Sequence, residues 1–213
     1  MNPKTSRHDD DAALGDDTVF RNMVRYEQQL PVHQISYYLC GELHEPQYYT
    51  ELFYTLRTSA ETDLIYLHLN SSGGDFNTGL QIINNIRAAN ARVVTILEAR
   101  AYSMAALIFL AGDELIVHDN CQLMFHTYSG VFAGKGNEQQ AEAHAVGDWF
   151  EKIMRRLSHP FLTDTEIDHI LKGSDLWMDS DEIAKRLTRI KRANANAQRK
   201  AAKPAGKGKA KAG

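Results

Sequence analysis

The sequence predicts an α/β fold with a largely parallel sheet, built as one compact domain. Short β-prone apolar runs alternate along the chain with segments whose apolar residues recur every three or four positions. This alternation is typical of parallel strands joined by right-handed helical crossovers. With 213 residues, 43% of them hydrophobic, the chain is long enough for one substantial core but short for two.

Five apolar runs are predicted as strands, at 35–39, 64–69, 93–97, 115–118 and 123–125. Helices are predicted within 46–58, over 78–89, over 101–112 and from Asn137 to Leu157. The third helix is apolar on nearly every side, which indicates burial. In the fourth, an apolar stripe repeats every four residues, at Ala141, Ala145, Trp149, Ile153 and Leu157.

The two ends of the chain differ in charge. Five aspartates lie between residues 9 and 17, whereas no acidic residue follows Glu182. Both ends offer too little apolar surface to offset the entropy of ordering, so 1–25 and 193–213 are predicted to be disordered around a domain at 26–192. The basic tail has no interleaved aromatic residues, which favours a solvated tail over a nucleic-acid contact.

The composition argues against several classes of protein function. The formal net charge is only -3, and the longest apolar run, 104–111, is far below the roughly 20 residues that a bilayer requires. We therefore expect a soluble cytoplasmic protein with no membrane contact. Cys40 and Cys121 are expected to be buried thiols, and neither a metal site nor a bound cofactor is predicted.

Three features suggest chemistry. Ser103 opens the apolar third helix, either as an N-cap or as a nucleophile beside backbone amides. Gly73-Gly74 lies at the end of a strand, where it forms either a plain turn or a place at which the backbone comes close to a ligand. No Gly-Lys-Ser/Thr motif follows it, so it does not predict a phosphate-binding loop. His126 ends another strand and is the best placed of nine histidines, although a lone histidine is usually structural.

Together these motifs resemble the Clp protease proteolytic subunit family, from about Ile35 to about Ile183. The run Asn70 to Gly74 resembles the family's Asn-Ser-Pro-Gly-Gly, Tyr102-Ser103-Met104 its nucleophile segment and Met124-Phe125-His126 its histidine segment. Asp175-Leu176-Trp177-Met178 resembles the segment that holds the family's acid. Asp164, Asp168 and Asp179 lie close by and remain alternatives to Asp175.

The resemblance implies a ClpP/crotonase-like fold of repeated βαβ units with a protruding handle strand and helix, and a serine endopeptidase activity. The implied site residues are a catalytic triad of Ser103, His126 and Asp175, oxyanion-hole amides of Gly74 and Met104, and a substrate-binding strand at Gly130, Val131 and Phe132. The implied partners are polypeptide substrates, further copies in heptameric rings stacked in pairs, and an ATP-dependent AAA+ unfoldase. ATP would be used only by that unfoldase.

Some positions depart from the family pattern, which marks a divergent member of bacterial or phage origin. Ser72 replaces the usual proline, Ala99 a glycine and Thr127-Tyr128 a Gln-Pro pair, while 186–189 differs from the usual domain end. Two alternatives stay open, namely a non-catalytic ring or scaffold subunit and a crotonase-type acyl-CoA enzyme. A serine–lysine dyad has little room, because no lysine lies between Lys4 and Lys135.

Overall fold

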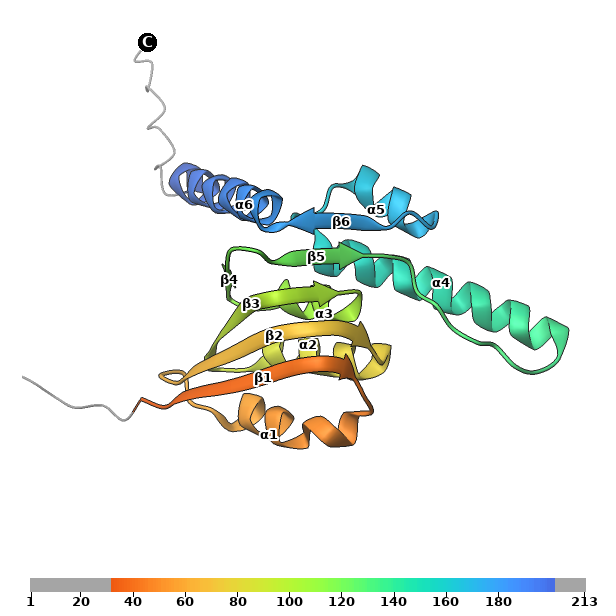
Figure 1. Ribbon diagram of the computed structural model, residues 1–213, viewed down its shortest axis with the longest axis horizontal. Coiled ribbons are helices and arrows are strands. Elements are labelled where there is room, and N and C mark those ends of the chain that lie inside the picture. Colours follow the sequence, from red (N-terminus) through yellow and green to blue (C-terminus); the bar gives the residue numbers. More distant parts are fainter. Residues whose placement is uncertain (1–31, 202–213) are drawn as a thin grey trace, which may run out of the picture. The chain divides into compact units, whose positions relative to one another are not determined.

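A computed structural model describes residues 32–201 (Figure 1). The predicted disorder of 1–25 and of 202–213 lies outside these residues. The strands are β1 Gln34–Leu43, β2 Leu64–Gly74, β3 Arg92–Tyr102, β4 Glu114–Val117, β5 Gln122–Phe125 and β6 Leu176–Asp179. The helices are the 3₁₀ turn η1 Pro46–Tyr49, α1 Thr50–Thr58, α2 Phe76–Ala88, α3 Met104–Phe109, α4 Gly136–Ser158, α5 Asp164–Leu171 and α6 Ser180–Ala201.

The sheet is mostly parallel, which confirms the predicted α/β class. Its strand order is β1-β2-β3-β5-β6, with β4 also pairing with β3. The pairs among the first five strands are parallel, and β6 runs antiparallel to β5. Along β2, buried Ile65, Leu67 and Leu69 alternate with more exposed neighbours, so one face of this strand packs into the core formed with α1, α2 and α3.

The strands run further than their apolar residues indicate. β1 continues through Cys40 and Gly41 to Leu43, with a register shift after Gly41, and pairs with the polar end of β2. The predicted strand end at Cys40-Gly41 is therefore wrong. Backbone pairing does not depend on side-chain polarity, and Ser71 is buried at 1% exposure within this extension.

The third helix begins later than predicted. Ala101 and Tyr102 complete β3, and α3 starts only at Met104. Because these residues are apolar in both elements, their hydrophobicity does not mark the boundary. The boundary falls at Ser103, where the backbone turns.

Only the second half of the apolar stripe predicted for α4 is buried in the described structure. Ile153 and Leu157 are buried, whereas Ala141 and Ala145 are exposed and Trp149 is 44% exposed. A four-residue step exceeds the 3.6 residues of a helical turn, so such a row drifts around the helix. In Figure 1 the first turns of α4 extend beyond the sheet, and its last turns pack into the core.

The predicted handle strand is absent from the described chain. Residues 126–135 form neither strand nor helix, and Val131 is 96% exposed. Within residues 32–201 this segment has no neighbouring strand to pair with, and an extended segment without a partner forms no ladder. The handle helix itself is present as α4.

Two further expectations need correction. The disorder predicted from Ala193 is wrong for 193–201, because α6 continues to Ala201 through a run rich in alanine, the best helix former. Cys40 is exposed rather than buried, whereas Cys121 is buried and donates its S–H to the Leu97 carbonyl at 3.1 Å.

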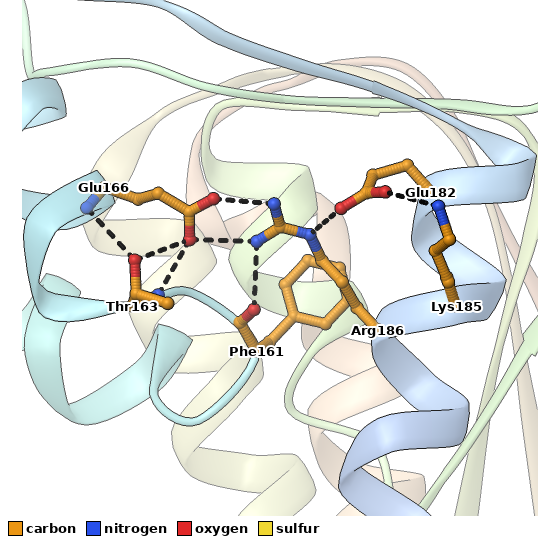
Figure 2. A network of polar contacts seen from close by, with 6 residues as sticks. All are labelled: Phe161, Thr163, Glu166, Glu182, Lys185 and Arg186. Carbon is orange, nitrogen blue, oxygen red and sulfur yellow. Dashed lines mark hydrogen bonds and ion pairs between the residues drawn. The ribbon is translucent and has the colours of Figure 1, made fainter.

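Arg186 ties α6 to α5 (Figure 2). Its guanidinium donates to both Glu166 carboxylate oxygens, at 2.6 and 2.9 Å, and also to Glu182 and the Phe161 carbonyl. These hydrogen bonds from Arg186 lower the pKa of Glu166 to about 2. The side chains of Arg186 and Glu166 are only 12% and 24% exposed, so solvent screens this bidentate pair weakly.

We expect Glu166→Gln to lower the free energy of unfolding by on the order of 2 kcal/mol at neutral pH. Because the folded-state pKa of Glu166 lies below its usual value of 4.5, its contribution is present above that value and is lost as the pH falls toward 2. Urea titrations across this pH range should show that the variant lacks this component. The exposed Glu142→Gln on α4 serves as control, and equal losses in both variants would contradict the role of the pair.

A second close contact joins α2 to α3. A Cβ added to Gly79 would lie 2.1 Å from Met104 Cγ, so the two helices approach at a position that accepts no side chain. We expect Gly79→Ala to destabilise the fold by about 1–3 kcal/mol, measured as a lower urea midpoint. Gly136→Ala on α4, where an added Cβ meets no atom within 4 Å, should be neutral or slightly stabilising.

The described residues contain neither a bilayer-length apolar helix nor a cluster of His, Cys, Asp and Glu suited to a metal ion.

Candidate functional site

Ser103 occupies a sharp turn between β3 and α3. Its backbone has φ 54° and ψ -124°, a conformation that non-glycine residues rarely adopt and that costs on the order of 1–3 kcal/mol. The Ser103 amide donates to the Met124 carbonyl at 2.8 Å, which anchors the turn to β5. Ser103 stands at the N-cap position of α3, but its side chain makes no capping hydrogen bond to the helix.

The paired glycines pack against this turn. Gly73 has φ 87°, and a Cβ there would lie 2.6 Å from the Tyr102 oxygen and 2.9 Å from Ser103 Cβ. Gly74 also has positive φ, at 142°, and lines a cavity together with Ser103 and Met104. The Met104 amide is the first of α3 and has no acceptor within that helix. Two backbone amides, of Gly74 and Met104, therefore come from residues that border the Ser103 cavity.

His126 borders the same cavity. It follows β5, whose Met124 pairs with Tyr102 of β3, so the ends of these two parallel strands lie together. Its side chain is half-buried. Among the described residues no hydrogen bond joins the Ser103 hydroxyl to the His126 ring, but catalytic hydrogen bonds are often long before substrate binds.

Asp175 reaches this region through the antiparallel pairing of β5 and β6 (Figure 1). Phe125 pairs with Leu176, so continuing the register sets His126 opposite Asp175. Asp175 itself is exposed and is not among the residues that line the cavity. The structure thus brings Ser103 and His126 to one cavity, and Asp175 is not part of its wall.

The three alternative aspartates have other contacts. Asp179 pairs with Gln122 at the far end of β6 and accepts a hydrogen bond from the Glu182 amide at 2.9 Å. Asp168 accepts a hydrogen bond from Arg155 at 2.6 Å, which lowers its pKa, and Asp164 lies 3.7 Å from the same guanidinium. None of these three aspartates lines the cavity.

Part of the cavity wall is apolar. The hydrophobic side chains that form this part come from α2, α3, β5 and α4, and they are Phe76, Met104, Leu107, Phe125, Phe150 and Met154. The motifs around Ser103 and His126 gave no indication of Phe76, Phe150 and Met154, because these residues come from helices distant in sequence. The only available indication was that apolar residues of α2 and α4 face the core.

The predicted substrate-binding residues lie beyond this cavity. Gly130 and Val131 are exposed, Phe132 is half-buried, and none of them lines the cavity. The lining residues of this segment are instead Thr127, Tyr128 and Ser129. Tyr128 donates its hydroxyl hydrogen to the Ala143 carbonyl at 3.3 Å, which links the segment to α4.

Comparison with known proteins identifies the family. The model of the Clp protease family matches residues 35–188. The ATP-dependent Clp protease proteolytic subunit 1 of Borreliella burgdorferi is 25% identical over 179 residues, which cover 79% of this chain and 91% of that protein. The matched range agrees with the resemblance found in the sequence motifs. With most of its length matched by the family model, the chain belongs to the Clp protease family.

Proposed function

We propose that the protein is a serine endopeptidase that cleaves peptides and unfolded polypeptides, with Ser103 as nucleophile. The observation that supports this most strongly is the strained Ser103 turn, whose side chain caps no helix and shares a cavity with His126. Strained backbone at a cavity is common at active sites. Apolar cavity walls suit a substrate with an apolar side chain next to the cleaved bond.

In the proposed reaction, Ser103 Oγ attacks the peptide carbonyl while His126 accepts its proton. His126 then protonates the leaving amine, and water hydrolyses the acyl-enzyme with the same histidine as base. The amides of Gly74 and Met104 stabilise the developing oxyanion, a contribution of about 3 to 4 kcal/mol per donor in comparable sites. Asp175 orients the imidazole and stabilises its protonated form.

The assembly belongs to the same proposal. We infer paired heptameric rings in the cytoplasm, fed by an AAA+ unfoldase, from the resemblance to the family. The name of the Borreliella relative describes a proteolytic subunit of an ATP-dependent protease. The exposed first half of α4 and the unpaired segment 130–135 are surfaces that further copies or an extended substrate can cover. Strand pairing by Gly130, Val131 and Phe132 would supply the substrate contact.

A non-catalytic ring or scaffold subunit is the second candidate. The exposed Asp175 side chain, which does not line the cavity, and the unmade bond between Ser103 and His126 favour it. A crotonase-type acyl-CoA enzyme has no such observation in its support. Reactivity at Ser103 separates the first two candidates.

We expect a fluorophosphonate probe to label the assembled protein at Ser103, because the probe reacts with hydroxyls activated by a base. Ser103→Ala should abolish labelling and peptide hydrolysis. Ser129→Ala, which alters another serine of the same cavity, should retain both. Unlabelled wild-type protein would support the scaffold subunit, and labelling that survives in Ser103→Ala would rule out this nucleophile.

We expect Asp175→Asn to lower kcat by about 10³- to 10⁴-fold, because an asparagine no longer stabilises the imidazolium. Asp179→Asn, at the last residue of β6, is the matched control, since asparagine caps helices as well as aspartate does. Steady-state hydrolysis of a fluorogenic peptide measures both variants. A comparable decrease in kcat in both variants, or a larger decrease in Asp179→Asn, would contradict the proposed role of Asp175.

A further inference from the structure

Two aromatic side chains meet on the face of the sheet that lies opposite the core. The rings of Tyr102 and Trp177 are in edge contact, with their centroids 5.2 Å apart and their planes at 72°. Aromatic pairs prefer arrangements of this kind, which stabilise the pair beyond the burial of its surface. The reaction proposed above uses neither side chain, and neither residue lines the Ser103 cavity.

Strand register places the two rings in one row. Tyr102 of β3 pairs with Met124 of β5, which pairs in turn with Trp177 of β6. Their neighbours Leu123 and Met178 belong to the buried core, so the row points to the other face of the sheet. Two strand spacings, about 10 Å, separate β3 from β6. The ring contact therefore joins two strands that are not hydrogen-bonded to each other.

This contact connects the segments that carry two of the proposed triad residues. Tyr102 directly precedes Ser103, the residue at the turn into α3. Trp177 follows Asp175 by two residues. The position of the Asp175 segment is thereby linked to the turn that holds the nucleophile.

The segment of Asp175 lies at an edge of the sheet. Its side chain is exposed, and the strand that follows it, β6, is four residues long and pairs only with β5 among the described strands. Short segments with few contacts open readily. Leu176 and Met178 attach β6 to the core on one face, and Trp177 attaches it to β3 on the other.

The Tyr102 ring is itself held in place. Its hydroxyl donates to the side-chain oxygen of Gln122 at 2.7 Å, and the Arg100 guanidinium lies 5.7 Å from the ring centroid. Tyr102 is half-buried, whereas Trp177 is 50% exposed. A ring that is already fixed offers Trp177 a defined surface, so less conformational entropy is lost when the two rings meet.

We infer that Tyr102 and Trp177 are positioning residues, whose ring contact holds the Asp175 segment where its carboxylate can orient His126. This inference rests on the proposed function, because it requires Asp175 to act in peptide hydrolysis. Misplacement of a catalytic group by about 1 Å can lower a rate by about 100-fold. Because neither ring borders the cavity, loss of the contact should change kcat rather than KM.

The test measures hydrolysis of a fluorogenic peptide by the full-length, assembled protein. Trp177→Ala should lower kcat by about 10- to 100-fold and change KM by less than about threefold. Trp177→Phe keeps an aromatic ring and should restore most of the wild-type kcat. The control Tyr54→Ala removes a ring on α1 that is 70% exposed, and it should leave kcat unchanged. Urea unfolding establishes that each variant is folded.

Two double variants separate positioning from a general structural role. In the Asp175→Asn background, Trp177→Ala should lower kcat by less than about twofold, because the ring acts through that carboxylate. A merely structural role would give the same fold-change in both backgrounds. Tyr102→Ala combined with Trp177→Ala should lower kcat no further than either change alone, because both remove the same contact.

Three results would overturn the inference while leaving the proposed function intact. They are a wild-type kcat in Trp177→Ala, an equal fold-change in the Asp175→Asn background, and additive losses from Tyr102→Ala and Trp177→Ala. Wild-type protein that neither hydrolyses the peptide nor reacts with a fluorophosphonate would overturn the proposed function and this inference together. The two failures are therefore distinguishable.

Discussion

The candidate site depends on a steric constraint between two turns. Gly73, at the end of β2, lies so close to the β3–α3 turn that any side chain would overlap the Tyr102 oxygen and Ser103 Cβ. This contact holds Ser103 in its positive-φ conformation, together with the hydrogen bond from its amide to Met124. The strain at Ser103 is therefore maintained by neighbouring strands rather than by the local sequence.

The parallel sheet explains why distant motifs meet. Strands β2, β3 and β5 run in the same direction, so the residues that follow them gather at one edge of the sheet, where α/β proteins commonly bind ligands. Strand β6 differs from these strands because it runs antiparallel to β5, so it starts where β5 ends. Asp175 directly precedes Leu176, the partner of Phe125, whereas Asp179 lies at the other end of β6.

The C-terminal helix α6 packs against the domain with one of its sides. Its apolar residues and Arg186 attach it to the core and to α5, and these contacts flank the segment that contains Asp175. Its other side presents Lys185, Arg189 and Arg192 to solvent. Because the two sets of residues do not overlap, the exposed side chains can change without loss of this packing.

Local patterns in the sequence determined much of this protein. The alternation of apolar runs and helical periods predicted the α/β class, and the spacing of the motifs around Gly74, Ser103 and His126 indicated the family. Apolar periodicity is a local property of the sequence, so it did not predict the polar extension of β2. Nor did it tell which half of the α4 stripe is buried, because burial depends on the elements that pack against the helix. The composition also predicted disorder from Ala193, although α6 continues to Ala201.

Only the tertiary structure decided the features that involve distant residues. It shows that Ser103 has positive φ and makes no capping hydrogen bond, and that Asp168 and Asp179 accept hydrogen bonds from Arg155 and from the Glu182 amide. The apolar walls contributed by Phe76, Phe150 and Met154 likewise come from helices far apart in the chain. Such features depend on which residues lie opposite one another across strands and helices. The order of residues along one chain does not contain this information.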